Sequence, residues 1–146
     1  MTRKYCLLFL LLSVITLTVS AQKPDAILGS WVTSNGDAHF LIYKKGDKFF
    51  GKLDWIKYLN DEQGKPKTDK NNPDPVLRSR PYTGLELLKD FTFDGDDNQY
   101  IDGTIYDPKN GKTYSCKMTL NGTTLKIRGY IGISLLGRTE TWTRLK

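Results

Sequence analysis

Charged and aromatic residues alternate near the end of the chain in a way that could form a binding site. Arg138, Glu140, Trp142 and Arg144 follow one another at a spacing of two. Side chains of a β-strand point alternately to its two faces, so these four residues share one face. A large aromatic residue is more often buried than exposed, and a buried carboxylate requires a charged partner. The alternation therefore predicts an interior ligand-binding cluster of Arg138, Glu140 and Trp142, with a solvated outer surface as the alternative.

A second candidate site lies in the basic segment 59–81, which contains Arg78 and Arg80 between Leu77 and Pro81. A guanidinium group fits carboxylate and phosphate as a fork, so this pair could clamp an anionic ligand. The alternative is a solvated, flexible loop.

The residues offer little for catalysis. His39 is the only histidine, so catalysis by a serine or cysteine with histidine would have to use it. Cys116 alternates with apolar residues and is expected to be a buried, inert thiol. Carboxylates cluster around Asp69 and Asp94 at spacings that calcium sites use, but Asp and Asn are also common turn formers. We therefore expect no enzyme, no metal and no cofactor.

The elements that would position these residues are β-strands. Asn35-Gly36 separates two extended runs, 27–34 and 38–44, and is a strong hairpin signal. Further extended runs are 48–58, 91–93, 99–106, 112–120, 123–130 and the segment from Arg138, and several of them have one apolar and one polar face. Such a series predicts an all-β protein, an antiparallel up-and-down, lipocalin-like β-barrel of about eight strands.

Two segments do not fit this alternation. Segment 59–81 is charged and rich in proline, and we expect one long loop there, because it shows no periodicity. Segment 83–89 is expected to form a short helix or a turn.

The N-terminus predicts export. Arg3 and Lys4 precede an apolar run of about 14 residues, and Val19-Ser20-Ala21 resembles a cleavage site, so residues 1–21 are expected to be a signal peptide. The run is shorter than the roughly 20 residues of a membrane span. Residues 22–146 would then form a single domain without an integral membrane span.

The composition of the mature chain fits a small exported domain. Losing Arg3 and Lys4 lowers the net charge from +6 to +4, a mild excess that does not favour nucleic-acid binding. Cys116 would be the one remaining cysteine, so the core must stabilise the fold without an internal disulfide.

Several motifs together resemble a known family. They are Gly29-Ser30-Trp31, the run from Gly64 to Pro81, Tyr106-Asp107-Pro108, Gly111 to Lys117, and Arg128 to Arg144. In this order they resemble the exported bacterial proteins catalogued as domain of unknown function 2147. The resemblance implies a lipocalin-like barrel in the periplasm or outside the cell, and it implies no activity. The chain also resembles lipocalins more loosely, which implies that Trp31 packs beneath Arg138 or Arg144 at the closed end.

These observations predict a periplasmic or secreted barrel that binds a small amphipathic or anionic ligand without catalysis. The alternative is a structural or interaction module of the cell envelope with a filled barrel. An enzyme is the third reading, because no spacing singles out a pair of carboxylates. A fold alone does not decide among them.

Overall fold

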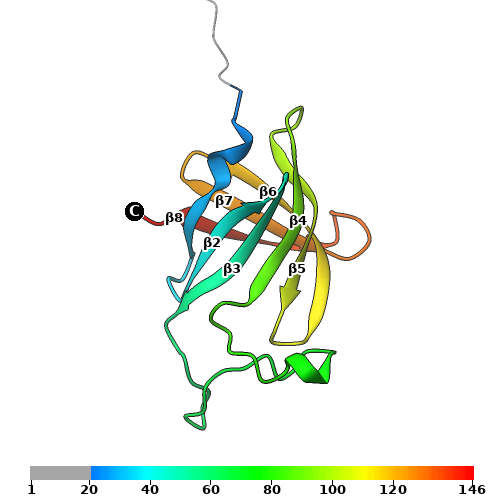
Figure 1. The fold of residues 1–146 in the computed structure, drawn as a ribbon. Coiled ribbons are helices and arrows are strands. Elements are labelled where there is room, and N and C mark those ends of the chain that lie inside the picture. Colours follow the sequence, from blue (N-terminus) through cyan, green and yellow to red (C-terminus); the bar gives the residue numbers. More distant parts are fainter. Residues whose placement is uncertain (1–20) are drawn as a thin grey trace, which may run out of the picture.

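The computed structural model describes residues 21–146, in which eight antiparallel strands form a closed barrel (Figure 1). Each strand pairs with the next along the chain, and the last strand returns to pair with the first. The all-β, up-and-down barrel predicted from the sequence is confirmed. The apolar run of the expected signal peptide lies outside the described residues. The strands are β1 (Gly29–Thr33), β2 (Ala38–Lys45), β3 (Lys48–Ile56), β4 (Glu86–Asp94), β5 (Gln99–Asp107), β6 (Lys112–Asn121), β7 (Thr124–Tyr130) and β8 (Gly137–Arg144).

The barrel interior is filled by large apolar side chains from every strand. Trp31, Phe49, Phe91, Tyr100 and Trp142 are among the largest fully buried side chains. Two inward-facing glycines leave room for their neighbours. A Cβ atom on Gly51 would lie 2.8 Å from Leu88, and one on Gly103 would lie 2.4 Å from the Phe91 ring. In a small barrel, small residues placed beside large ones allow the interior side chains to pack without overlap.

One end of the barrel is closed by a short 3-10 helix, η1 (Pro24–Ile27). Two buried aromatic side chains form hydrogen bonds to this helix. The indole Nε1 of Trp31 donates to the Ile27 carbonyl at 2.9 Å, and the Tyr100 hydroxyl donates to the Pro24 carbonyl at 2.7 Å. These bonds satisfy the polar tips of two aromatic side chains whose rings belong to the core.

The opposite end of the barrel carries the longer connections. Because the strands run alternately up and down, the β1–β2, β3–β4, β5–β6 and β7–β8 connections all lie there. We call this the open end. The longest of the four, residues 57–85, hangs below the barrel in Figure 1.

The structure corrects the expectation of a helix or turn at 83–89, because strand β4 begins at Glu86. Leu87 and Leu88 are consecutive and both buried, and Asp90 has a φ of 64°. The β3–β4 register also shifts between Phe49 and Gly51 and between Gly51 and Lys52. These irregularities remove the alternation of period two by which a strand is recognised in a sequence.

Residues 59–81 form a long loop, as expected, but it contains local structure. A 3-10 helix, η2 (Pro75–Leu77), begins at Asp74, whose carboxylate accepts from the Val76 amide. Isolated bridges join Asn60 to Pro66 and Thr68 to Pro81. In the part of the chain that the structure describes, neither this helix nor η1 has the length and apolar character needed to cross a membrane.

Candidate ligand site at the open end

Strand β8 carries the predicted cluster along its inward-facing side. Trp142 pairs with Leu125, Glu140 with Ile127 and Arg138 with Gly129, without a register shift. Directly paired residues of antiparallel strands point to the same face, and both Leu125 and Ile127 are buried. The three residues therefore follow the inner face of β8 from the core towards the open end.

The three side chains differ in their exposure to solvent. Trp142 is buried, whereas the Arg138 side chain is 87 % exposed and that of Glu140 is 52 % exposed. The expected buried carboxylate is therefore not found, because the inner face of β8 reaches solvent within one residue pair of Trp142. Arg138 Nη2 lies 3.9 Å from Glu140 Oε1, and an ion pair this exposed contributes little to stability.

Trp142 combines close packing with an unpaired donor. Its ring stacks on Phe40, with centroids 4.1 Å apart and an angle of 17° between the planes. Its indole Nε1 is buried and has no hydrogen-bond partner among residues 21–146. Most buried polar groups are paired, and leaving one unpaired costs roughly 1–3 kcal/mol. This donor is thus available to an acceptor atom that reaches the site.

The open end contains a small cavity of about 230 Å³ beneath the long loop. Its wall includes Ile56 at the end of β3, together with Leu59, Pro66, Lys67 and Tyr82. Trp142 lies three strands away from this wall: it pairs with Thr33 on β1, Thr33 Oγ1 accepts from the Ala38 amide, and Ala38 on β2 pairs with Ile56 on β3. Drug-sized ligands occupy about 300–1,000 Å³, so this cavity suits a smaller molecule.

Arg144 belongs to the closed end instead. Its guanidinium carbon lies 4.3 Å from the centroid of the Trp31 ring, and its nitrogens donate to the carbonyls of Ala26 and Leu28. The chain order left open whether Arg138 or Arg144 would meet Trp31, and the structure brings Arg144 to it. Arg138 lies at the other end of β8.

Arg78 and Arg80 stabilise the long loop from within. Arg80 Nη2 lies 3.0 Å from Asp69 Oδ2, and Arg78 Nε donates to the Asn72 carbonyl at 2.7 Å. Asp69 is fully buried and also accepts from the Tyr106 hydroxyl at 2.5 Å and from the Asn72 amide at 2.7 Å. A buried charge needs such partners. The two arginines are thereby engaged with the loop, and the structure does not bring them together with Arg138.

The sequence indicated Asp69 as one of a group of carboxylates, but it did not predict the hydrogen bond from Tyr106. Tyr106 lies 37 positions away in β5, and no local pattern links it to Asp69. Burial, followed by the hydrogen bond to Asp69, raises the pKa of Tyr106 to about 12. The alternation of Arg78 and Arg80 was the one available signal, and it pointed to the right loop.

The remaining polar candidates are the carboxylates, His39 and Cys116. No three His, Cys, Asp or Glu side chains within residues 21–146 come close enough to hold a metal. His39 stacks on Trp55 on the outer face, with ring centroids 4.5 Å apart. Cys116 is buried as expected, and burial raises its pKa to about 12.

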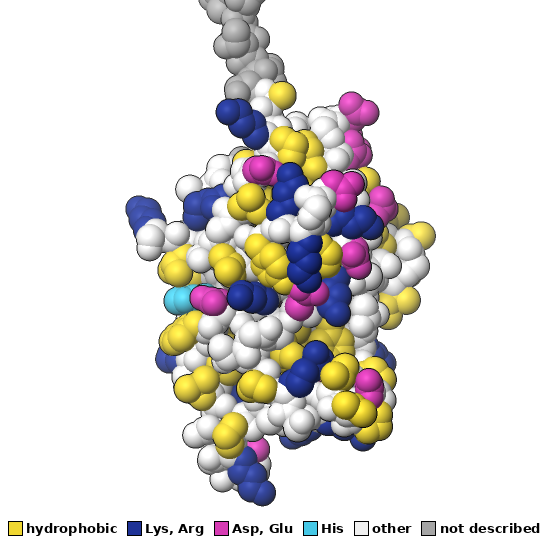
Figure 2. All heavy atoms as spheres, in the orientation of Figure 1, with side chains coloured by type: hydrophobic (Ala, Val, Ile, Leu, Met, Phe, Trp, Pro, Cys, Tyr) yellow, Lys and Arg dark blue, Asp and Glu magenta, His cyan; other side chains and the backbone are white. Residues whose placement is uncertain are grey.

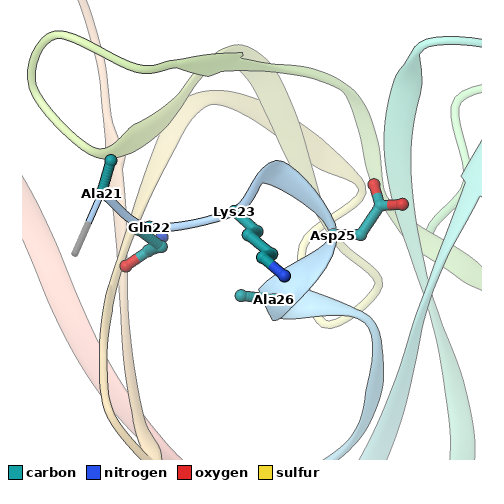
Figure 3. Close-up of a pocket in the computed structure, with 5 residues that line it drawn as sticks. All are labelled: Ala21, Gln22, Lys23, Asp25 and Ala26. Carbon is teal, nitrogen blue, oxygen red and sulfur yellow. The ribbon is translucent and has the colours of Figure 1, made fainter.

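A shallow open hollow of about 480 Å³ also lies at the closed end, beside η1. Its lining side chains, including Gln22, Lys23 and Asp25, point in different directions (Figure 3). They do not converge on a common point, so the hollow is not a candidate site.

Comparisons with known proteins agree with this architecture. A family model described as "Uncharacterized protein conserved in bacteria (DUF2147)" matches residues 29–144. A solved structure, protein HP1028 from the human pathogen Helicobacter pylori, is described as belonging to the lipocalin family. It is similar with a TM-score of 0.67 and 27 % identity, covering 82 % of each chain. No curated protein matches the chain.

Proposed function

The chain belongs to the bacterial DUF2147 family of uncharacterised proteins, so we propose its function from the structure of the barrel. We propose that it is an exported, non-enzymatic barrel that binds a small amphipathic anion at its open end. The observation that carries the proposal is the unpaired Nε1 donor of Trp142, buried on the same face of β8 as Glu140 and Arg138.

Each residue has a distinct part in the proposed complex. The Trp142 donor takes an acceptor oxygen of the ligand, which removes the cost of leaving it unpaired. The exposed Arg138 guanidinium binds the anionic group as a fork, and in the described part of the chain its one close counter-charge is Glu140 at 3.9 Å. The apolar part rests against the cavity below the long loop.

The filled interior restricts the ligand. Phe40, Leu125 and Ile127 occupy the barrel around Trp142, so a long chain has no room to pass into the centre. The ligand is therefore short or lies mostly outside the barrel. The same filled interior favours the second candidate, a structural or interaction module of the cell envelope, in which no ligand is bound.

Binding of octanoate, compared with octylamine, separates the two functions. We expect titration calorimetry to detect octanoate, which combines a short apolar chain with a carboxylate, and not octylamine, whose charge is opposite. The Arg138→Gln variant should weaken octanoate binding about tenfold, because a charge-assisted hydrogen bond contributes about 1.5–3 kcal/mol. Lys126→Gln, which removes an exposed cation from the outer face of β7, is the matched control and should bind normally.

Two outcomes would contradict the proposal. Equal binding of octanoate and octylamine would show that no anion site exists. Failure of both to bind, together with a native mass spectrum free of any retained molecule, would favour the module. The export part has its own test, in which the N-terminal sequence of the protein recovered from the host envelope should begin at Gln22.

A further inference from the structure

The connection between β7 and β8 displays apolar side chains to solvent. In the segment 131–136 the exposed fractions are 70 % for Ile131, 59 % for Ile133, 82 % for Leu135 and 71 % for Leu136. Figure 2 shows apolar side chains at the right edge of the molecule, where the orange loop lies in Figure 1. Single exposed apolar residues are ordinary, but four exposed apolar side chains within six positions are typical of an interaction site.

This segment, which we call the apolar loop, is held in place by Arg128. Arg128 Nε donates to the Ser134 carbonyl at 2.5 Å, Nη2 to the Leu135 carbonyl at 3.2 Å, and Nη1 to Thr139 Oγ1 at 2.8 Å. A further backbone bond joins the Leu136 amide to the Ile133 carbonyl at 3.1 Å. These bonds satisfy the loop backbone without turning its apolar side chains inward.

Positive charge is concentrated on the strands beside the apolar loop. Residues 112–144, which contain β6, β7 and β8, include one carboxylate, Glu140, and six cations, Lys112, Lys117, Lys126, Arg128, Arg138 and Arg144. Residues 22–111 have 13 Lys and Arg against 15 Asp and Glu, a net charge of −2. The net positive charge of the mature chain therefore comes mainly from the last three strands.

Three of these cations, Lys117, Lys126 and Arg128, lie on the outer face of these strands, which has no negative charge. Lys117 pairs directly with Arg128, and Lys126 lies between Thr119 and Thr141 on the same face. Glu140 pairs with the buried Ile127 and so belongs to the inner face. By contrast, the face over β2–β4 shown in Figure 2 mixes Lys and Arg with carboxylates, including the pair of Lys45 and Glu86.

From the apolar loop and its basic surroundings, we propose that this protein docks on an anionic phospholipid surface. The side chains of Ile131, Ile133, Leu135 and Leu136 insert at the level of the headgroups, and the β6–β8 face lies against the negative charge. Apolar insertion combined with attraction of basic residues is how proteins bind reversibly to membrane surfaces. A second copy of the chain fits less well, because two such basic faces would repel each other. The apolar loop lies at the open end near Arg138, but this role uses its exposed apolar side chains and the outer face of β6–β8, not the proposed ligand site.

Vesicle co-sedimentation tests the proposal. The mature protein should sediment with vesicles of phosphatidylcholine mixed with phosphatidylglycerol, remain mostly in solution with phosphatidylcholine alone, and be released by salt. The double variant Leu135→Ser/Leu136→Ser should bind about tenfold more weakly, since each leucine loses part of its transfer free energy. Val76→Ser removes an equally exposed apolar side chain from the long loop and should bind as the wild type does.

A single-site probe reports insertion directly. In Leu135→Trp, the added fluorescence should shift to the blue on the anionic vesicles and be quenched by brominated lipid. Unchanged fluorescence, or equal sedimentation of the wild type and the double serine variant, would overturn the proposal. So would a dimer in sedimentation velocity that the double variant abolishes, because the apolar loop would then serve a second copy. Octanoate binding should persist in the double variant, which keeps this test independent of the proposed function.

Discussion

The guanidinium group of Arg144 lies over the ring of Trp31, and the two residues are also direct partners across the β1–β8 pair. The guanidinium group simultaneously binds the carbonyls of Ala26 and Leu28, so it connects the last strand, the first strand and the segment of η1. This arrangement closes the barrel and covers the end of its core.

Replacing Trp31 should be among the most damaging single changes. Trp31→Ala removes a fully buried indole and its bond to Ile27, and we expect a loss of about 3–5 kcal/mol in the free energy of unfolding. Urea denaturation followed by circular dichroism measures it. Trp55→Ala, at a tryptophan that is partly exposed, is the control and should cost far less. An unchanged midpoint for Trp31→Ala would contradict the closure described above.

The Cys116 thiol should be unreactive in the folded protein. Burial raises its pKa to about 12, so the thiolate that reacts with disulfide reagents is almost absent near neutral pH. We expect labelling of the native mature protein at a rate set by its unfolding, and fast labelling in urea. Rapid labelling of the native protein would show that the thiol is accessible.

The Tyr106 hydroxyl should make stability sensitive to alkali. Its pKa rises from 10.0 to about 12 on folding, so the stabilisation is complete below pH 10 and is lost as the pH approaches 12. Tyr106→Phe should cost about 1.5–3 kcal/mol at neutral pH, the usual contribution of a hydrogen bond to a charged group. Its stability should then fall less steeply than that of the wild type between these pH values.

A matched variant tests whether this behaviour is specific to Tyr106. The Tyr114 hydroxyl contacts only the exposed side chain of Asn110, so Tyr114→Phe should change stability little. Equal losses in the two variants would mean that the bond to Asp69 has no special weight.

Glu140 and Trp142 should respond differently to perturbation. Glu140→Gln should change the free energy of unfolding by less than about 1 kcal/mol, because its ion pair is exposed. The difference between the emission of the wild type and of Trp142→Phe should be blue-shifted, since Trp142 is buried. Emission like that of indole in water would place this face of β8 outside and remove the proposed ligand site.

The sequence predicts the barrel well where local chemistry decides the structure. Asn35-Gly36 forms the expected turn, with Gly36 at a φ of 73°. The alternation of Tyr114, Cys116, Met118 and Leu120 matches the inner face of β6, because a strand with one buried face must repeat every two residues. In these segments each local preference agrees with the final fold.

Prediction fails where distant parts of the chain decide the structure. The inner face of β8 follows from its alternation, but whether Glu140 is buried depends on where the barrel wall ends. The order of the long loop depends on Asp69 meeting Tyr106 and Arg80, which are far apart in the sequence. The first part of strand β4, residues 86–90, was not predicted because the left-handed residue Asp90 interrupts the alternation, whereas its second part was predicted at 91–93.

Because β1 pairs with β8, the closed barrel does not depend on which strand comes first in the chain. All other pairings join strands that are consecutive in the chain, and the backbone of Leu145 already binds the carbonyl of Ser30. Joining the two ends by a short linker and cutting the chain in another connection would preserve every strand pair. Six of the seven consecutive pairings join strands across short connections and β3–β4 spans residues 57–85, whereas the meeting of Trp31 with Arg144 requires the whole chain. In such a circular permutant the contact between Trp31 and Arg144 would be local in sequence. The strand pair at the cut would then be the one that joins the two ends of the chain.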